Sequence, residues 1–216
     1  MAKVINQLID VNQTGAGPNK NITENIYGID SIIELMEIND WNGYLVSFDQ
    51  EKAFDRVEHN YTIQVLKKMN FPPGIIRWIE IIYKDIKSTI QINGHLTKEI
   101  KIERSIRQGC SLSMTIYALI IEPLASNIRN SKDIKGINLP KTEKKNAHYS
   151  NTQMTALTII TEISDYDHLV KEFKRFGEVS GSKINESKTE ILEIGRKKTI
   201  INQQIKDLIK EKMLKY

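Results

Sequence analysis

An aspartate that ends a strand-like run is the first residue whose position could do chemistry. In "YLVSFDQEKAFDRV", residues 44–57, five apolar or strand-forming residues precede Asp49, and Asp55 follows six residues later. Carrying a carboxylate into a dry environment costs free energy unless a partner offsets its charge. A carboxylate at a strand end is a common ligand for a divalent metal. Taken alone, a strand that ends in Asp49 is weak evidence, because a capping or turn aspartate is the more common case.

A second candidate segment is "SIRQGCSLSM", residues 105–114, which precedes a largely apolar run. Backbone N–H groups just ahead of a helix can face a phosphate or a base, and Gly109 allows close approach. Gln108 can hydrogen-bond there without adding charge. A loop whose glycine serves only the turn explains the same three residues, Arg107 included.

Apolar residues at helical and alternating spacing predict an α+β chain, with a short sheet backed by helices on one side. Thr23 is the predicted cap of the first long helix, and Pro123 should interrupt a later one. "GHL", residues 94–96, should link the two strands of a hairpin. The predicted helices are 23–38, 59–69, 75–86, 112–129 and 164–179, and the predicted strands are 44–49, 88–93, 98–103, 155–160 and 188–195.

Composition narrows the class of protein. The 216 residues are 40% apolar, which is enough for a core, and the net charge of +4 permits a nucleic-acid partner without requiring one. No run approaches the roughly 20 apolar residues of a membrane helix. A single cysteine, Cys110, excludes an internal disulfide framework, so we expect an intracellular protein, nuclear or cytoplasmic and not secreted. The histidines show no zinc spacing; they are His59, His95, His148 and His168.

Several segments, in this order and spacing, together resemble one family. "SFDQEKAFDRVEH", "GHLTKEIKIERSIRQGCSLSMTIYALIIEPLASNIR", "IKGI" and "SGSKINESKTEIL" look like the reverse transcriptase domain of non-LTR (LINE-type) retrotransposons. The resemblance implies an α+β polymerase palm, an antiparallel sheet backed by helices, with part of the fingers and no thumb. It implies partial fingers and their connection to the palm at 1–42, the palm at 43–195 and a basic helical tail at 196–216.

The resemblance also assigns roles to single residues. Asp49 matches the catalytic, metal-binding aspartate, and Phe54 matches the aromatic residue that packs under the incoming sugar and excludes a 2′-hydroxyl. Gln108 and Gly109 match a loop that contacts nucleotide and template, and Lys188 matches a lysine near the triphosphate. The implied activity is RNA-templated DNA synthesis, with RNA template, DNA primer and dNTP as partners. The implied cofactor is Mg²⁺, as two ions about 3.5–4 Å apart.

One motif of the resemblance is missing. A strand–turn–strand reading Tyr-Ala-Asp-Asp should lie between "IKGI" and "TALTII", where this chain has "HYSNTQMTALTII". Tyr149 can match the tyrosine, and Ser150, Asn151 and Thr152 then occupy the Ala-Asp-Asp positions. None of these three carries a negative charge, and one aspartate cannot hold two divalent ions. The chain as written is therefore predicted not to polymerise.

A reading of possible codons offers a hypothesis for this loss. With TCA-AAT-ACG-CAG-ATG-AC encoding "SNTQMT", skipping two bases gives AAA-TAC-GCA-GAT-GAC, or Lys-Tyr-Ala-Asp-Asp. The serine codon and the third bases of several other codons can vary, so this codon string is one choice among several. Residues around 150–154 would then be translated out of frame, at the end of the stretch 130–153 that is predicted to be irregular. Sequencing the transcript tests this, because codons that cannot spell the aspartate pair exclude it.

Two other functions remain open from the sequence. A catalytically inert palm that binds nucleic acid would share every motif except the missing one. An unrelated α+β phosphotransferase would explain Asp49 but not the "RQGC" loop. In that loop, Ser111 and Met114 stand where the family that the chain resembles has prolines. Without proline the backbone at the start of the helix is less restricted, but no group that could contact a ligand is lost.

Overall fold

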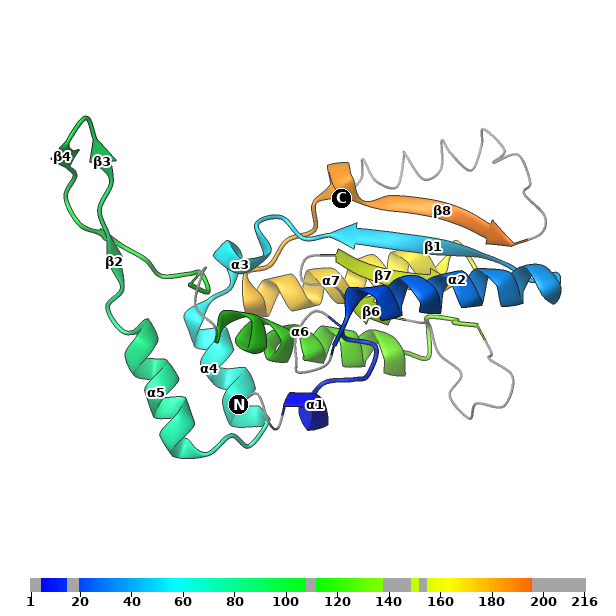
Figure 1. The fold of residues 1–216 in the computed structure, drawn as a ribbon, viewed down its shortest axis with the longest axis horizontal. Helices are drawn as coiled ribbons and strands as arrows, with labels where there is room; N and C mark the ends of the chain where they lie inside the picture. The colour runs from blue at the N-terminus through cyan, green and yellow to red at the C-terminus, as the bar shows by residue number, and fades with distance from the viewer. Residues whose placement is uncertain (1–4, 15–19, 108–111, 138–148, 152–154, 196–216) are drawn as a thin grey trace.

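A four-stranded antiparallel sheet forms the centre of the molecule (Figure 1). The structure is a computed structural model that describes residues 5–14, 20–107, 112–137, 149–151 and 155–195. The strand order is β6-β7-β1-β8, so β1 is paired on both sides. The strands are β1 (Asn42–Asp49), β6 (Tyr149–Asn151), β7 (Thr155–Ile160) and β8 (Glu190–Gly195).

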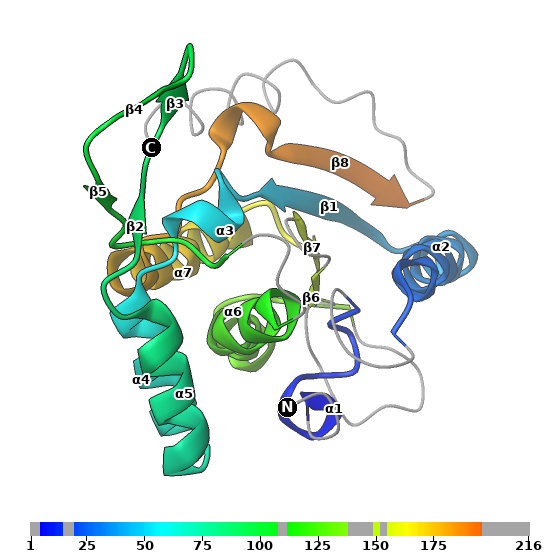
Figure 2. The ribbon, with the colours of Figure 1, turned by 60° about the vertical axis from the view of Figure 1, so that its left-hand side comes forward.

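Helices α6 (Ser113–Asn130) and α7 (Asp165–Ser180) cover one face of this sheet, and α4 (His59–Lys68) packs beside them (Figures 1 and 2). Phe48 of β1 is fully buried against α7, with ring centroids 4.4 Å from Phe173 and 5.8 Å from Tyr166. Burying an aromatic side chain of this size contributes about 1.5–3 kcal/mol, so this face carries much of the stability.

Helix α2 (Ile22–Ile38) lies on the opposite face and packs against β8 (Figure 2). Its buried residues, including Met36, meet Ile159 and Ile194 of the sheet. The sheet is therefore covered on both faces in this region, and the prediction of helices on one side was incomplete. The predicted cap was also wrong by two residues, because the side chain of Asn21 accepts the hydrogen bond from the N–H of Thr23.

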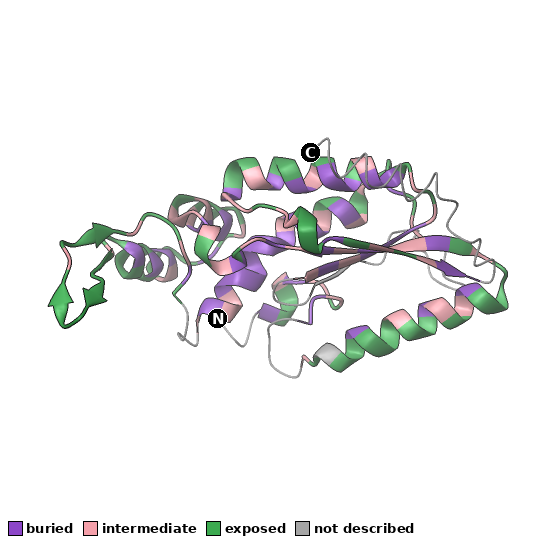
Figure 3. Ribbon diagram, turned by 90° about the horizontal axis from the view of Figure 1, so that it is seen from above, coloured by how far each residue is buried: buried purple, intermediate pink, exposed green. Residues whose placement is uncertain are grey.

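A narrow arm projects from the body next to α5 (Pro73–Tyr83) (Figure 1). It consists of two ladders, β2 (Lys87–Ser88) with β5 (Ile100–Lys101) and β3 (Gln91–Ile92) with β4 (His95–Leu96). The hairpin was predicted, but its turn is Asn93–Gly94, both with positive φ, and not "GHL". Left-handed residues of this type give the tight turn whose twist matches the strands. The arm is almost entirely exposed (Figure 3).

Helix α6 continues through Pro123, contrary to the predicted interruption. Proline removes one backbone N–H, but the helix is buried along most of its length and tertiary packing holds it. Two side chains also donate to carbonyls in the preceding turn. Tyr61 donates to the carbonyl of Ile120 at 3.1 Å, and Gln13 donates to that of Ala118 at 2.9 Å.

The other predicted elements agree in type and nearly in length. The strand predicted at 155–160 is β7, and the helix predicted at 23–38 is α2. The stretch 130–153 is not wholly irregular, because Tyr149–Asn151 pairs with β7. Three short helices complete the described elements: α1 (Ile5–Leu8), α3 (Ala53–Arg56) and the 3-10 turn η1 (Glu186–Lys188). The predicted tail, 196–216, lies outside the described residues.

None of the helices in the described part of the chain is long and apolar enough to cross a bilayer.

A mostly buried ion cluster ties the beginning of the chain to α6. Arg129 lies 3.5 Å from the carboxylate of Asp10 and also pairs with Glu122. The side chains of Arg129 and Glu122 are 14% and 10% exposed. Burial raises the pKa of Glu122, and the positive charge of Arg129 partly opposes that rise. Losing the cation would leave a buried carboxylate without compensation.

Replacing Arg129 with Met should therefore lower the free energy of unfolding by about 3 kcal/mol at pH 7. The pKa of Glu122 should rise further in this variant, so the loss should shrink as the pH falls and the carboxyl becomes neutral. Urea denaturation at several pH values measures both effects. Arg175→Met removes an exposed pair with Glu172 and should cost no more than about 0.5 kcal/mol. A loss that is independent of pH would contradict this account of Glu122.

Candidate active site

Asp49 is the last residue of β1 and lies on the face of the sheet opposite α6 and α7. Side chains alternate along a strand, so Phe48 and Gln50 point to the helices and Asp49 points away from them. Asp49 is partly exposed, whereas Phe48 and Gln50 are buried. Across the sheet, Asp49 is paired with Thr155, the first residue of β7. The strand thus ends on a partly exposed carboxylate, and the predicted strand end at Asp49 is confirmed.

Asn185 is the side chain that holds this carboxylate. Its amide donates to Asp49 Oδ2 at 3.2 Å, and its backbone N–H donates to the carbonyl oxygen of Asp49 at 2.8 Å. The N–H of Lys188 in turn donates to the carbonyl of Asn185 at 3.1 Å. The turn that carries the exposed Lys188 is therefore anchored directly to the end of β1. These bonds explain how a carboxylate at this position is tolerated.

Phe54 lies on α3, five residues after Asp49 in the chain. Its ring stacks on that of Tyr117 of α6. The ring centroids are 4.5 Å apart with an interplanar angle of 26°. The hydroxyl of Tyr117 donates to Oε1 of Gln50 at 2.9 Å. Burial raises the pKa of Tyr117, and the negative charge of Asp49 adds to the rise. The hydroxyl therefore stays protonated at neutral pH and acts as a donor.

Sequence reasoning missed both Gln50 and Tyr117. The alternation along β1 was available as a signal, since it turns a polar Gln50 toward the core. Tyr117 is one aromatic residue in a long apolar run and gives no signal of its own.

The segment that leads to the predicted nucleotide loop runs along α3. The N–H of Ile106 donates to the carbonyl of Phe54 at 2.8 Å, and the N–H of Ser105 donates to that of Val57 at 2.9 Å. Gln108 and Gly109 follow at once in the chain but lie outside the described residues. The structure therefore brings Asp49, Phe54 and the Lys188 turn to one end of the sheet, with residues 105–107 beside them.

Strands β6 and β7 form the hairpin that the resemblance required. Tyr149 pairs with Thr158, and Asn151 pairs with Ala156. The backbone of Tyr149, Ser150 and Asn151 belongs to β6, whereas Thr152 lies outside the described residues. Residues 152–154, which link the two strands, lie outside the described residues, and Thr155, the first residue of β7, pairs with Asp49.

The described residues do not fit a centre for two divalent metals. Among them, no three His, Cys, Asp or Glu side chains gather closely enough to hold an ion. Asp49 supplies one carboxylate, and one of its oxygens accepts from Asn185. A pair of divalent ions needs several carboxylates, so these residues alone are insufficient.

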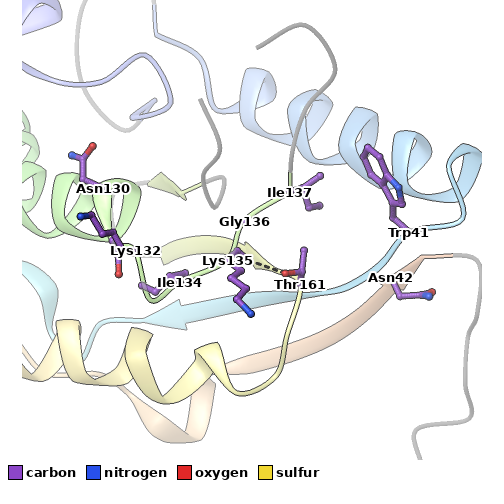
Figure 4. A pocket seen from close by; sticks show the side chains of 10 residues that line it. Trp41, Asn42, Asn130, Lys132, Ile134, Lys135, Gly136, Ile137 and Thr161 are labelled. Atoms are coloured by element: carbon purple, nitrogen blue, oxygen red, sulfur yellow. Dashed lines mark hydrogen bonds between the residues drawn. The ribbon is translucent and has the colours of Figure 1, made fainter. Parts of the chain in front are cut away.

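Two hollows lie away from Asp49. One, of about 820 Å³, is lined by Trp41 and Asn42 at the start of β1 and by the segment 130–137 (Figure 4). In its wall, Thr161 donates to the carbonyl of Lys135. β1 has eight residues, so this hollow lies about 23 Å along the strand from Asp49. The second, of about 970 Å³, lies between α4, α6 and α7. Neither hollow is part of the Asp49 site.

Comparison with known families agrees with this geometry. A family model described as reverse transcriptase (RNA-dependent DNA polymerase) matches residues 1–215. The chain belongs to the reverse transcriptase family. Members of this family typically use Mg²⁺ and bind nucleic acids.

Curated relatives connect this reverse transcriptase domain to non-LTR retrotransposons. It is 27% identical over 218 residues to the transposon TX1 uncharacterized 149 kDa protein of Xenopus laevis. It is 29% identical over 93 residues to a retrovirus-related Pol polyprotein from the type-1 retrotransposable element R2 of Popillia japonica. These matches cover 100% and 43% of this chain, and 16% and 13% of the two relatives. The chain thus spans a small part of their length.

Solved structures share the reverse transcriptase fold with this chain. Apo telomerase from Candida tropicalis gives a TM-score of 0.61 at 12% identity, covering 92% of this chain and 36% of that one. Telomerase from Candida albicans, solved with the TWJ fragment of telomeric RNA, gives a TM-score of 0.58 at 14% identity. The match covers 80% of this chain and 30% of that one. At such identities the likeness concerns the fold alone.

Ser105, at the entrance to the nucleotide loop, has a strained backbone. Its φ is 106°, a region that L side chains rarely adopt. Its N–H donates to Val57, and His59 Nε2 lies 3.0 Å from its carbonyl oxygen. Burial lowers the pKa of His59, which favours the neutral ring. These contacts hold the strained conformation in place.

Ser105→Gly should raise the free energy of unfolding by about 1 kcal/mol, because glycine adopts this φ without a clash of Cβ. Urea denaturation measures the change. Ser88→Gly, on the exposed strand β2, is the control at an ordinary φ and should not raise the free energy of unfolding. If Ser105→Gly did not raise it either, Ser105 would not be strained.

Proposed function

We propose that this chain is the palm of a non-LTR reverse transcriptase that does not polymerise as written. The observation that carries the proposal is the pairing of Asp49 with Thr155, the residue that follows the β6–β7 link in the chain. That link, residues 152–154, reads Thr-Gln-Met and brings no carboxylate. The fold and the family membership support the palm, and the sequence of the link supports its inactivity.

The register also indicates where the missing carboxylates belong. Asn151 pairs with Ala156, which itself pairs with Phe48, so Asn151 is two strands away from β1. Along the strands Asn151 is therefore level with Phe48 and not with Asp49. Thr155 is the direct neighbour of Asp49, at a Cα distance of about 5 Å. An aspartate pair that completes the site should therefore fall at 153–155.

This placement supports the out-of-frame hypothesis. In the shifted reading, the two aspartate codons overlap codons 153, 154 and 155 of the present frame. They do not overlap codons 151 and 152, where an in-frame alignment on Tyr149 would put them. The pairing of Thr155 with Asp49 is compatible with this codon reading.

The retained residues keep their proposed roles in binding. Asp49 would be the catalytic residue of an intact site, held in place by Asn185. Phe54 would pack under the sugar, Lys188 would lie near the triphosphate, and Gln108 with Gly109 would contact nucleotide and template. Mg²⁺, where a complete site binds it, would supply charge stabilisation at the reacting phosphate. The chain's own part is to present and orient these side chains.

Gln153→Asp combined with Met154→Asp should tighten Mn²⁺ binding by at least about tenfold, because affinity for a hard cation rises with the number of carboxylates. Electron paramagnetic resonance of free Mn²⁺ measures the dissociation constant. Adding Asp49→Asn should remove the gain. Thr89→Asp with Gln91→Asp adds the same charge on the exposed arm and should leave binding unchanged. A gain that persists without Asp49 would place the ion elsewhere.

Primer extension on an RNA template with Mg²⁺ should give no product with the chain as written. Filter binding with a salt titration, on the same template, distinguishes an inert palm that binds nucleic acid from a protein that does not. Synthesis by the unaltered chain that disappears with Asp49→Asn would overturn the proposed inactivity.

A further inference from the structure

A buried polar pair lies beneath the proposed sugar-contacting residue. Gln50 is 4% exposed and Tyr117 is 3% exposed, and the two share one hydrogen bond of 2.9 Å. The other amide atom of Gln50, Nε2, has no hydrogen-bond partner among the described residues. Burying a half-satisfied amide lowers stability compared with an apolar residue of the same size. A contribution to the site would explain why this position carries a glutamine.

The hydrogen bond fixes the orientation of Tyr117. A buried tyrosine has two soft torsions in its side chain, and the bond at its hydroxyl restrains the far end of the ring. The Cα end of the side chain is fixed by the backbone of α6, in which the neighbouring residues Ile116 and Ala118 are also buried. The ring of Tyr117 is therefore held at both ends.

The ring of Phe54 depends on this fixed surface. Its backbone is anchored, because its carbonyl accepts from Ile106 and the pair of Glu51 with Arg56 at 2.9 Å restrains α3. The ring itself is only partly buried and rests on Tyr117 with a centroid distance of 4.5 Å. Offset stacking of this kind favours one placement of a ring over others.

We propose that Gln50 and Tyr117 are positioning residues for Phe54, and that through it they set the discrimination between deoxyribonucleotides and ribonucleotides. This inference rests on the proposed role of Phe54 under the incoming sugar. A ring that is displaced by a fraction of an ångström leaves room for a 2′-hydroxyl. The bond between Gln50 and Tyr117 prevents that displacement from below, without touching the nucleotide.

The first test concerns the position of the ring and needs no nucleotide. para-Fluorophenylalanine is incorporated at position 54 of the full chain, and its fluorine NMR signal is recorded. Tyr117→Phe keeps the stacked ring but removes the hydroxyl, and it should shift or broaden the signal. Gln50→Leu should act in the same way. Tyr61→Phe is the matched control, because it removes a hydroxyl that donates to the carbonyl of Ile120 and not to Gln50, and it should leave the signal unchanged.

The second test concerns the selection of sugars. In the chain that carries Gln153→Asp and Met154→Asp, the dissociation constants of dATP and ATP are measured by equilibrium dialysis. Tyr117→Phe should reduce the ratio of the two dissociation constants, which measures the preference for dATP, roughly threefold to tenfold. Most of this change should come from stronger binding of ATP. Phe54→Ala should abolish the preference, and Tyr61→Phe should preserve it. A loss of protein stability alone would weaken the binding of dATP and of ATP by the same factor.

The outcomes separate this inference from the proposed function. An unchanged fluorine signal in Tyr117→Phe would overturn the inference and leave the proposed function intact. So would an unchanged preference in Tyr117→Phe together with a lost preference in Phe54→Ala. If Phe54→Ala kept the preference, or neither nucleotide bound, the proposed role of Phe54 would fail and the selection of sugars with it.

Discussion

The alternation of side chains along β1 is the constraint on which the site depends. Because this strand is paired on both sides, its register is set by β7 and β8 together. Phe48 must enter the aromatic core, and Asp49 then has to point to the other face. A slip of one residue would bury the carboxylate and expose the phenylalanine, so the burial of Phe48 enforces the position of Asp49. The same alternation returns Gln50 to the helices.

The site is assembled from segments that are far apart in the chain. Asp49 and Asn185 are separated by 136 residues and still share two hydrogen bonds. Ile106 reaches back to Phe54, and Tyr117 reaches Gln50 across 67 residues. The geometry of the site is therefore a property of the complete fold and not of any single motif.

The sequence predicted the elements well where periodicity and local chemistry agree. β1, β7 and α2 have strong patterns, and Asp49 was expected at a strand end because it follows an apolar run. The errors arose where tertiary packing decides. Pro123 does not interrupt α6, since burial outweighs one lost backbone bond. Tyr117 could not be singled out, because its importance comes from Gln50 and Phe54, which only the fold brings near. Gln108 and Gly109 stay predictions.

The arm beyond α5 bears on where the chain unfolds locally. Its two ladders have four residues each, no described segment forms a layer behind them, and Ile90, Ile92 and Leu96 are more than half exposed. Such a ribbon gains little from packing, so its hydrogen bonds can break while the rest of the chain stays intact. We therefore expect these two ladders to open locally more often than the packed sheet and its helices unfold.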